Sequence, residues 1–260
     1  MGYKLGDIVV DRTVYGVAEN SAGELLYTLT QLADATIDVT AESKDAKDAN
    51  GTLIKRFWTG KAGTFTANNA MVNVNIMGAM SGTDPISASQ EVPIDMPKII
   101  TVKAGGTATL TDFVDGTVKV NALGTNGTMG KAYQKAVSPS NTEYSLTEEG
   151  VFTPPTDENE VQYIIKYTRK VKKGTVVRNL ADKFPKTIKL TLKVLAVDPC
   201  EQDVLKAGYV EITSFQPSPE TSLALTTDAQ LEFKGDLQVD YCSTEKTLYS
   251  FYWADDDVEE

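Results

Sequence analysis

The sequence has 260 residues, 41% of them hydrophobic and 23% charged, so it can bury a core in one large β domain or in two modest domains. It contains no histidine and two cysteines, which excludes the commonest general base and the usual histidine sites for zinc, copper and iron; we expect no metal and no cofactor. A net charge of −11 argues against a protein that binds nucleic acid through the phosphates. No apolar run approaches the roughly 20 residues of a membrane helix, so no membrane insertion is expected.

The first part of the chain, residues 1–81, is predicted to form mainly β-strands. Ile37 and Val39 alternate with polar neighbours, as on a half-buried strand. A polar stretch, residues 42–51, follows and closes with the strong turn signal Asn50-Gly51. Because long loops in β proteins often make contacts, this stretch is expected to be an exposed contact loop. The strands predicted here lie at 7–11, 14–18, 25–29, 35–40, 53–58 and 64–66.

Residues 70–80 allow two interpretations. Val74 and Ile76 alternate with asparagines, which is typical of a strand. Val74 and Met77 also share a stripe at helical spacing, and the asparagine pair at 68–69 could provide an N-cap, which favours a short buried helix. Periodicity alone does not decide between them.

The middle of the chain, residues 86–182, differs from its flanks. It combines short strands with turn signals about every 8–12 residues, which is typical of a small sandwich. It holds 11 basic and 11 acidic residues, so the whole negative excess lies outside it, and we expect a boundary on each side. The last part, residues 183–260, returns to longer strands such as 187–195. The fold class is therefore predicted to be mainly β.

Two expectations concern the burial of single residues. Cys200 and Cys242 are expected to be reduced core thiols, or to form one bridge if the fold brings their Cα atoms to roughly 4.4–6.8 Å. Large aromatic side chains are more often core than binding platform, and this expectation covers Phe57, Trp58, Phe65, Phe233, Tyr241, Phe251 and Trp253.

One succession of segments resembles a known family. Residues 35–43, the polar stretch with Asp48 and Gly51, residues 53–57 and residues 63–67 together resemble the major tail tube proteins of tailed bacteriophages. The resemblance implies a strand pair with a long stacking loop, a short helix at 70–80, and closing strands at 208–253. It thus implies a discontinuous tail-tube-like β sandwich or barrel, residues 1–85 and 183–260, with an Ig-like β sandwich inserted at residues 86–182.

The same resemblance implies a structural, non-enzymatic function. Six subunits would form a ring, and stacked rings would form a tail tube through which genome DNA passes without specific binding. Other tail proteins, including a sheath, would be partners, and the protein would belong to the virion tail, assembled in the host cytoplasm. Asp38 and Glu42 are the candidate lumen acids. The candidate inter-ring stacking residues are Glu42, Lys44, Asp45, Lys47, Asp48, Leu53 and Ile54.

Two other function classes stay open at this point. A capsid-decoration or adhesin-type module of a phage particle would show the same β-rich pattern without forming a tube. A carboxylate-based glycosidase needs only two acids that are close in space, which no sequence pattern reveals.

Overall fold

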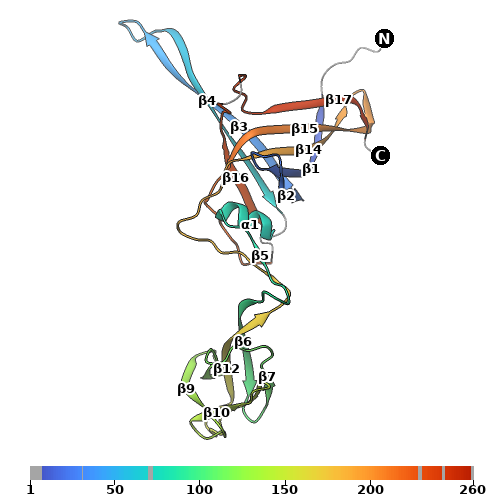
Figure 1. The fold of residues 1–260 in the computed structure, drawn as a ribbon. Coiled ribbons are helices and arrows are strands. Elements are labelled where there is room, and N and C mark those ends of the chain that lie inside the picture. Colours follow the sequence, from blue (N-terminus) through green and yellow to red (C-terminus); the bar gives the residue numbers. More distant parts are fainter. Residues whose placement is uncertain (1–7, 31, 70–72, 228–229, 242–243, 259–260) are drawn as a thin grey trace. The chain divides into compact units, whose positions relative to one another are not determined.

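The computed structural model describes residues 8–30, 32–69, 73–227, 230–241 and 244–258 (Figure 1). Strands make up 58% of the chain and helix 3%, which confirms the prediction of a mainly β fold with one short helix. The chain divides into two compact units, one formed by residues 1–85 and 177–260 and the other by residues 86–176. No helix among the described residues is long and apolar enough to cross a membrane.

The larger unit is built on one eight-stranded sheet with the order β2-β1-β14-β15-β16-β4-β3, in which β17 also pairs with β15. β2 and β3 stand at opposite ends of this order, although only position 31 separates them in the chain. The sheet therefore curls back on itself into a nearly closed, barrel-like wall. Its strands are β1 (Val9–Glu19), β2 (Leu25–Thr30), β3 (Leu32–Lys47), β4 (Leu53–Asn69), β14 (Ile188–Asp198), β15 (Glu201–Pro217), β16 (Leu231–Leu237) and β17 (Ser250–Val258).

The core of the larger unit is centred on three phenylalanines from neighbouring strands. Phe65, Phe215 and Phe233 lie on β4, β15 and β16 and have no exposed surface. Their ring centroids are 5.5–6.4 Å apart in edge-to-face and tilted arrangements, which are favourable for aromatic pairs. Leu190 and Leu192 add to the same cluster from β14. The alternation predicted for residues 187–195 thus places its apolar side in the core.

The helix of this unit is α1 (Val74–Ser81), so the helical interpretation of this segment is correct. Ile76 and Met80, four residues apart on one face, are buried in the core cluster. The helix ends at Gly82, which adopts a left-handed conformation with φ of 65°. A Cβ at this position would lie 2.3 Å from the backbone oxygen of Phe184, so both the conformation and the packing require glycine.

The start of α1 differs from the expected one. The N-cap is Asn73, whose side-chain oxygen accepts hydrogen bonds from the backbone N–H groups of Asn75 at 2.8 Å and Ile76 at 3.3 Å. The asparagine pair at 68–69 instead ends strand β4, where it pairs with β3 and β16. Residues 70–72, which the prediction included in the helix, lie outside the described residues.

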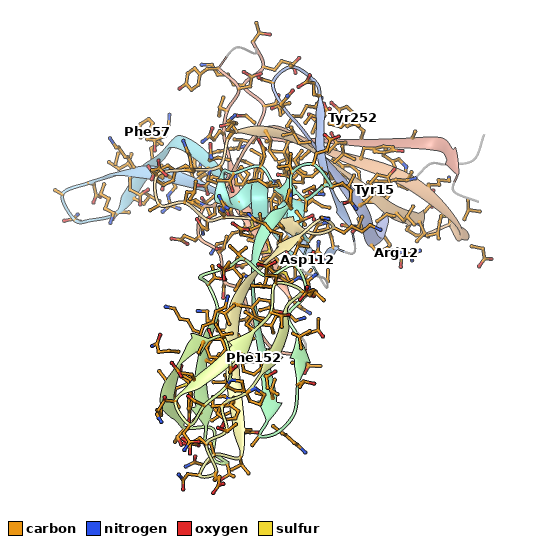
Figure 2. All side chains as sticks on the ribbon, turned by 60° about the horizontal axis from the view of Figure 1, so that its bottom comes forward. Arg12, Tyr15, Phe57, Asp112, Phe152 and Tyr252 are labelled. Atoms are coloured by element: carbon orange, nitrogen blue, oxygen red, sulfur yellow. The ribbon has the colours of Figure 1, made fainter. Side chains whose placement is uncertain are left out.

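The smaller unit has a seven-stranded sheet with the order β6-β12-β8-β9-β10-β11-β7. Tyr163, Ile165 and Phe152 have no exposed surface and share one core cluster, separate from that of the larger unit; Phe152 is labelled inside this unit in Figure 2. A two-stranded ribbon of β5 and β13 lies next to both chain connections of this unit. The strands are β5 (Ile86–Ser87), β6 (Ile94–Lys103), β7 (Ala108–Thr109), β8 (Lys119–Leu123), β9 (Met129–Ala136), β10 (Glu143–Leu146), β11 (Val151–Thr153), β12 (Gln162–Val171) and β13 (Thr175–Val176).

The expectation of two core thiols is wrong for Cys200. This residue is exposed in the turn between β14 and β15, where its backbone N–H donates to Asp198 Oδ1 at 2.8 Å. Because Cys200 lies in this tight surface turn, it is exposed, although cysteine is usually buried. Cys242 lies outside the described residues.

Candidate functional site

The candidate site is a hairpin that extends beyond the barrel-like sheet. β3 and β4 pair along their length from Leu32 to Asn69, whereas β16 pairs with β4 only between Gly63 and Asn69. Residues 40–62, which we call the arm, therefore form a two-stranded ribbon, and Figure 1 shows it projecting from the sheet of the larger unit. Residues 42–47, expected to belong to a loop, continue strand β3. Pairing with β4, with register shifts after Glu42 and after Ala46, provides backbone hydrogen bonds along one edge of this stretch, which makes a strand possible for such a polar sequence.

The tip of the arm is a tight turn, as the Asn50-Gly51 signal predicted. Asp48 Oδ1 accepts hydrogen bonds from the backbone N–H groups of Asn50 at 2.9 Å and Thr52 at 2.8 Å. Gly51 has a φ of 83°, which glycine adopts without strain. The end of the arm is therefore a tight turn held by hydrogen bonds to Asp48.

Residues on the arm alternate between two faces. Ile37 and its partner Phe65 pack into the core, so β3 residues with odd numbers continue this side of the sheet outward. Asp38, with its partner Thr64, lies on the opposite side, and β3 residues with even numbers continue that side. Between Glu42 and Ser43 a bulge shifts the pairing by one residue on β4. Beyond this bulge, Trp58 and Arg56 lie on the core side of the ribbon and Phe57 lies on the opposite side.

The structure brings the predicted stacking residues together on the arm. Glu42, Lys44, Asp45 and Lys47 lie on β3, and Asp48 lies in the turn. Leu53 and Ile54 begin β4 and are 48% and 68% exposed. The set is thus gathered at the outer half of one hairpin, on both of its faces.

The two candidate lumen acids lie on one face of β3, opposite the core. Asp38 pairs across the sheet with Thr64, which also pairs with Asp236 of β16. Asp38, Glu42 and Asp236 are all exposed. The outer surface of β3, β4 and β16 is therefore polar and carries carboxylates beyond the two that the sequence suggested.

Two aromatic residues on the arm are the main correction to the sequence-based site. Phe57 and Trp58 were expected in the core, but they are 50% and 66% exposed (Figure 2 labels Phe57). The same expectation is wrong for Tyr241 and Phe251, which are also exposed. Phe57 and Trp58 follow directly after Leu53-Ile54-Lys55-Arg56, so apolar residues occupy both faces of the strand. That pattern departs from the one-sided alternation of a half-buried strand, and it was the available signal that the subunit's own core covers only part of this apolar surface.

Basic side chains of the arm lie over these rings. Arg56 forms an ion pair with Asp45, Nε to Oδ1 at 2.8 Å, and its guanidinium lies 5.8 Å from the Trp58 ring centroid. Lys55 Nζ lies 5.0 Å from the Phe57 centroid on the other face. The hydrogen bond from Arg56 lowers the pKa of Asp45, so this carboxylate stays charged in neutral solution. Cation–aromatic pairs therefore occur on both faces of the arm.

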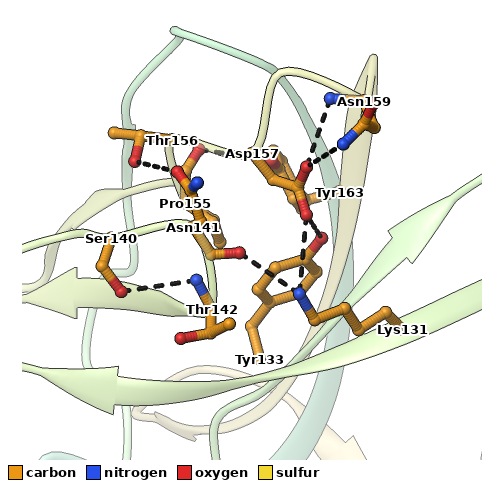
Figure 3. A network of polar contacts seen from close by, with 10 residues as sticks. All are labelled: Lys131, Tyr133, Ser140, Asn141, Thr142, Pro155, Thr156, Asp157, Asn159 and Tyr163. Carbon is orange, nitrogen blue, oxygen red and sulfur yellow. Dashed lines mark hydrogen bonds and ion pairs between the residues drawn. The ribbon is translucent and has the colours of Figure 1, made fainter.

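A polar network in the smaller unit is structural (Figure 3). Asp157 Oδ2 accepts from Tyr133 Oη at 3.1 Å and lies 3.6 Å from Lys131 Nζ. Asp157 Oδ1 accepts from both the backbone and the side chain of Asn159. The backbone hydrogen bond from Asn159, together with the others, lowers the pKa of Asp157, whereas burial raises the pKa of Tyr133. The network ties the loop after β11 to strand β9.

The fold and the arm define a class of protein. A curled sheet with an exposed apolar hairpin is typical of a structural protein that binds other subunits, and the described residues contain no group of acidic or cysteine side chains that could hold a metal ion.

The chain belongs to the YomU/Tube protein family, whose model matches residues 9–250. This confirms the resemblance to phage tail tube proteins, and the family indicates a tube-type structural component of a phage virion. The curated proteins that were compared gave no match.

Proposed function

We propose that this chain assembles with copies of itself into hexameric rings, and that the rings stack into the tail tube through which DNA is ejected. The observation that supports this proposal most directly is the arm, which exposes large apolar residues on both faces beyond the subunit's own core. Exposed apolar hairpins of this kind are costly in a monomer and typical of subunit contacts. Membership in a tube protein family points the same way.

The arm makes the contact between rings in this proposal. Leu53 and Ile54 supply exposed apolar surface at its end, and Asp48 fixes the shape of the turn. An arm that fits a different surface of the next subunit gives a head-to-tail contact, and such contacts generate open-ended stacks. The remaining contact residues are Glu42, Lys44, Asp45 and Lys47.

Asp38 and Glu42 face the lumen in this proposal. They lie on the side of β3 away from the core, and the same side of the sheet carries the exposed Asp236. Carboxylates on the inner wall repel DNA phosphates, so the genome slides past without being held.

The inserted unit, residues 86–182 in the sequence and 86–176 by compactness, is an Ig-like decoration of the tube. Its own core cluster, separate from that of the larger unit, supports this role. Other tail proteins and, in a contractile tail, a sheath are the further partners. Assembly takes place in the host cytoplasm and the product is the virion tail.

Negative-stain electron microscopy of the purified chain at high concentration tests the function. Stacked rings with a central channel are expected for the natural sequence, whereas Leu53→Lys and Ile54→Lys are expected to stop stacking without unfolding the subunit. Val137→Lys is the matched control, because Val137 is 99% exposed in the smaller unit. Small dispersed particles from the natural sequence would instead favour a decoration or adhesin module. Long tubes from both lysine variants would refute the role of these two residues.

A further inference from the structure

One face of the arm continues the surface that covers the subunit's core. Along β3, Ile37 packs against the core cluster, and Val39, Ala41, Ser43 and Asp45 follow on the same side. Their cross-strand partners on β4 are Gly63, Lys61, Trp58 and Arg56. We call this set from Val39 to Asp45, with its partners Lys61, Trp58 and Arg56, the core-side arm face.

The subunit stops covering this face at a defined point. Leu237 at the end of β16 packs against Gly63, where an added Cβ would lie 3.1 Å from Leu237 Cβ. At that position Val39, the β3 partner of Gly63, is 42% exposed, and beyond it Trp58 is 66% exposed. An open hollow borders the Trp58 ring and is lined by Ala41, Trp58, Thr59, Gly60 and Lys61. Ala41 has a small side chain and Gly60 has none, which leaves room for an apolar side chain to enter beside the ring.

Two of the charged groups on this face already pair with each other. Arg56 and Asp45 pair at 2.8 Å, and the guanidinium lies over Trp58. A charged pair with its hydrogen bonds in place tolerates loss of water far better than a lone charge. Trp and Arg are also the residues most enriched among those that dominate binding at protein interfaces.

The charge of the arm indicates what covers it. Residues 40–62 hold five basic and three acidic residues, a net charge of +2, in a chain whose net charge is −11. The rest of each copy is therefore strongly acidic and attracts the arm of another copy. A second copy thus offers both the opposite charge and, in a tube, the necessary proximity.

We infer that the core-side arm face is buried against a second copy of this chain, with Trp58 as the anchor, while the Phe57 ring on the opposite face stays accessible to water. The inference rests on the proposed function, since it needs an assembled tube. It adds to that proposal the face that is used and the residues that carry the contact.

Tryptophan fluorescence tests the inference, because Trp58 and Trp253 are the chain's two tryptophans. In a Trp253→Phe variant, Trp58 is the single reporter, and acrylamide quenching is compared between free subunits and assembled tubes. Quenching is expected to fall several-fold on assembly. The matched control keeps Trp58 and adds Phe57→Trp to the Trp253→Phe variant, which places a second reporter on the other face of the same strand. In its tubes the emission of this second reporter is expected to remain quenchable.

The outcomes separate this inference from the proposed function. Tubes in which Trp58 stays as accessible as in free subunits would overturn the inference and leave the tube function standing. Equal protection of the reporter at position 57 would overturn the choice of face. If the natural sequence forms no tubes at concentrations where electron microscopy would detect them, the proposed function and this inference both fail.

Discussion

Replacing Phe233 in the centre of the larger core should destabilise that unit alone. The side chain has no exposed surface and packs against Phe65 and Phe215 with ring centroids 6.4 and 5.5 Å away. Because a whole ring is buried, Phe233→Ala is expected to lower the free energy of unfolding by about 4 kcal/mol. For a unit of this size each kcal/mol shifts the melting temperature by roughly 2–4 °C, so a decrease of roughly 8–16 °C is expected.

Differential scanning calorimetry at a concentration too low for assembly measures this effect. Two transitions are expected, because the two units have separate cores. The matched control is Ile165→Val in the smaller core, which should cost about 1 kcal/mol and lower only the other transition by roughly 4–8 °C. If Phe233→Ala lowers both transition temperatures equally, the two units unfold as one, and their separate cores are not independently stable.

Three further outcomes follow from the structure. Because the pKa of Asp157 is lowered, this carboxylate contributes stability above pH about 4, and the contribution is lost as the pH falls through the lowered value. The melting temperature of the smaller unit should therefore fall more steeply with acid in the natural chain than in the Asp157→Asn variant. Gly82→Ala should destabilise the larger unit by more than about 1 kcal/mol in chemical denaturation, and clearly more than Gly51→Ala, which has open space around it. Replacing residues 88–174 with Asn-Gly, between the paired Ser87 and Thr175, should leave the larger unit's calorimetric transition in place.

Each of these has a result that contradicts it. Identical acid sensitivity of the natural chain and Asp157→Asn would mean that the network does not contribute to folding. Equal losses for the two glycine variants would show that the close approach to the chain at Phe184 is relieved at no cost. Loss of the larger unit's transition after the deletion would show that its folding requires the inserted segment.

Local patterns sufficed for the parts of the site that depend on neighbouring residues. The turn at Asn50-Gly51 follows from the backbone preferences of those two residues, and Asp48 completes it with its own side chain. The strand at 187–195 follows from alternation. The helix at 74–81 was decided by Ile76 and Met80, which reach the core together only at helical spacing, a fact that depends on where the core lies.

The sequence by itself determined a mainly β chain, the turn at the end of the arm and the resemblance to a tube family, because strand alternation, turn preference and segment order are properties of the chain. Only the tertiary structure decided that residues 42–47 are strand and that Phe57 and Trp58 are exposed. The physical reason is that alternation assigns a side chain to a face, whereas long-range pairing decides whether that face is covered. Here β16 ends its pairing with β4 at Gly63, and every apolar residue of the arm lies beyond that point.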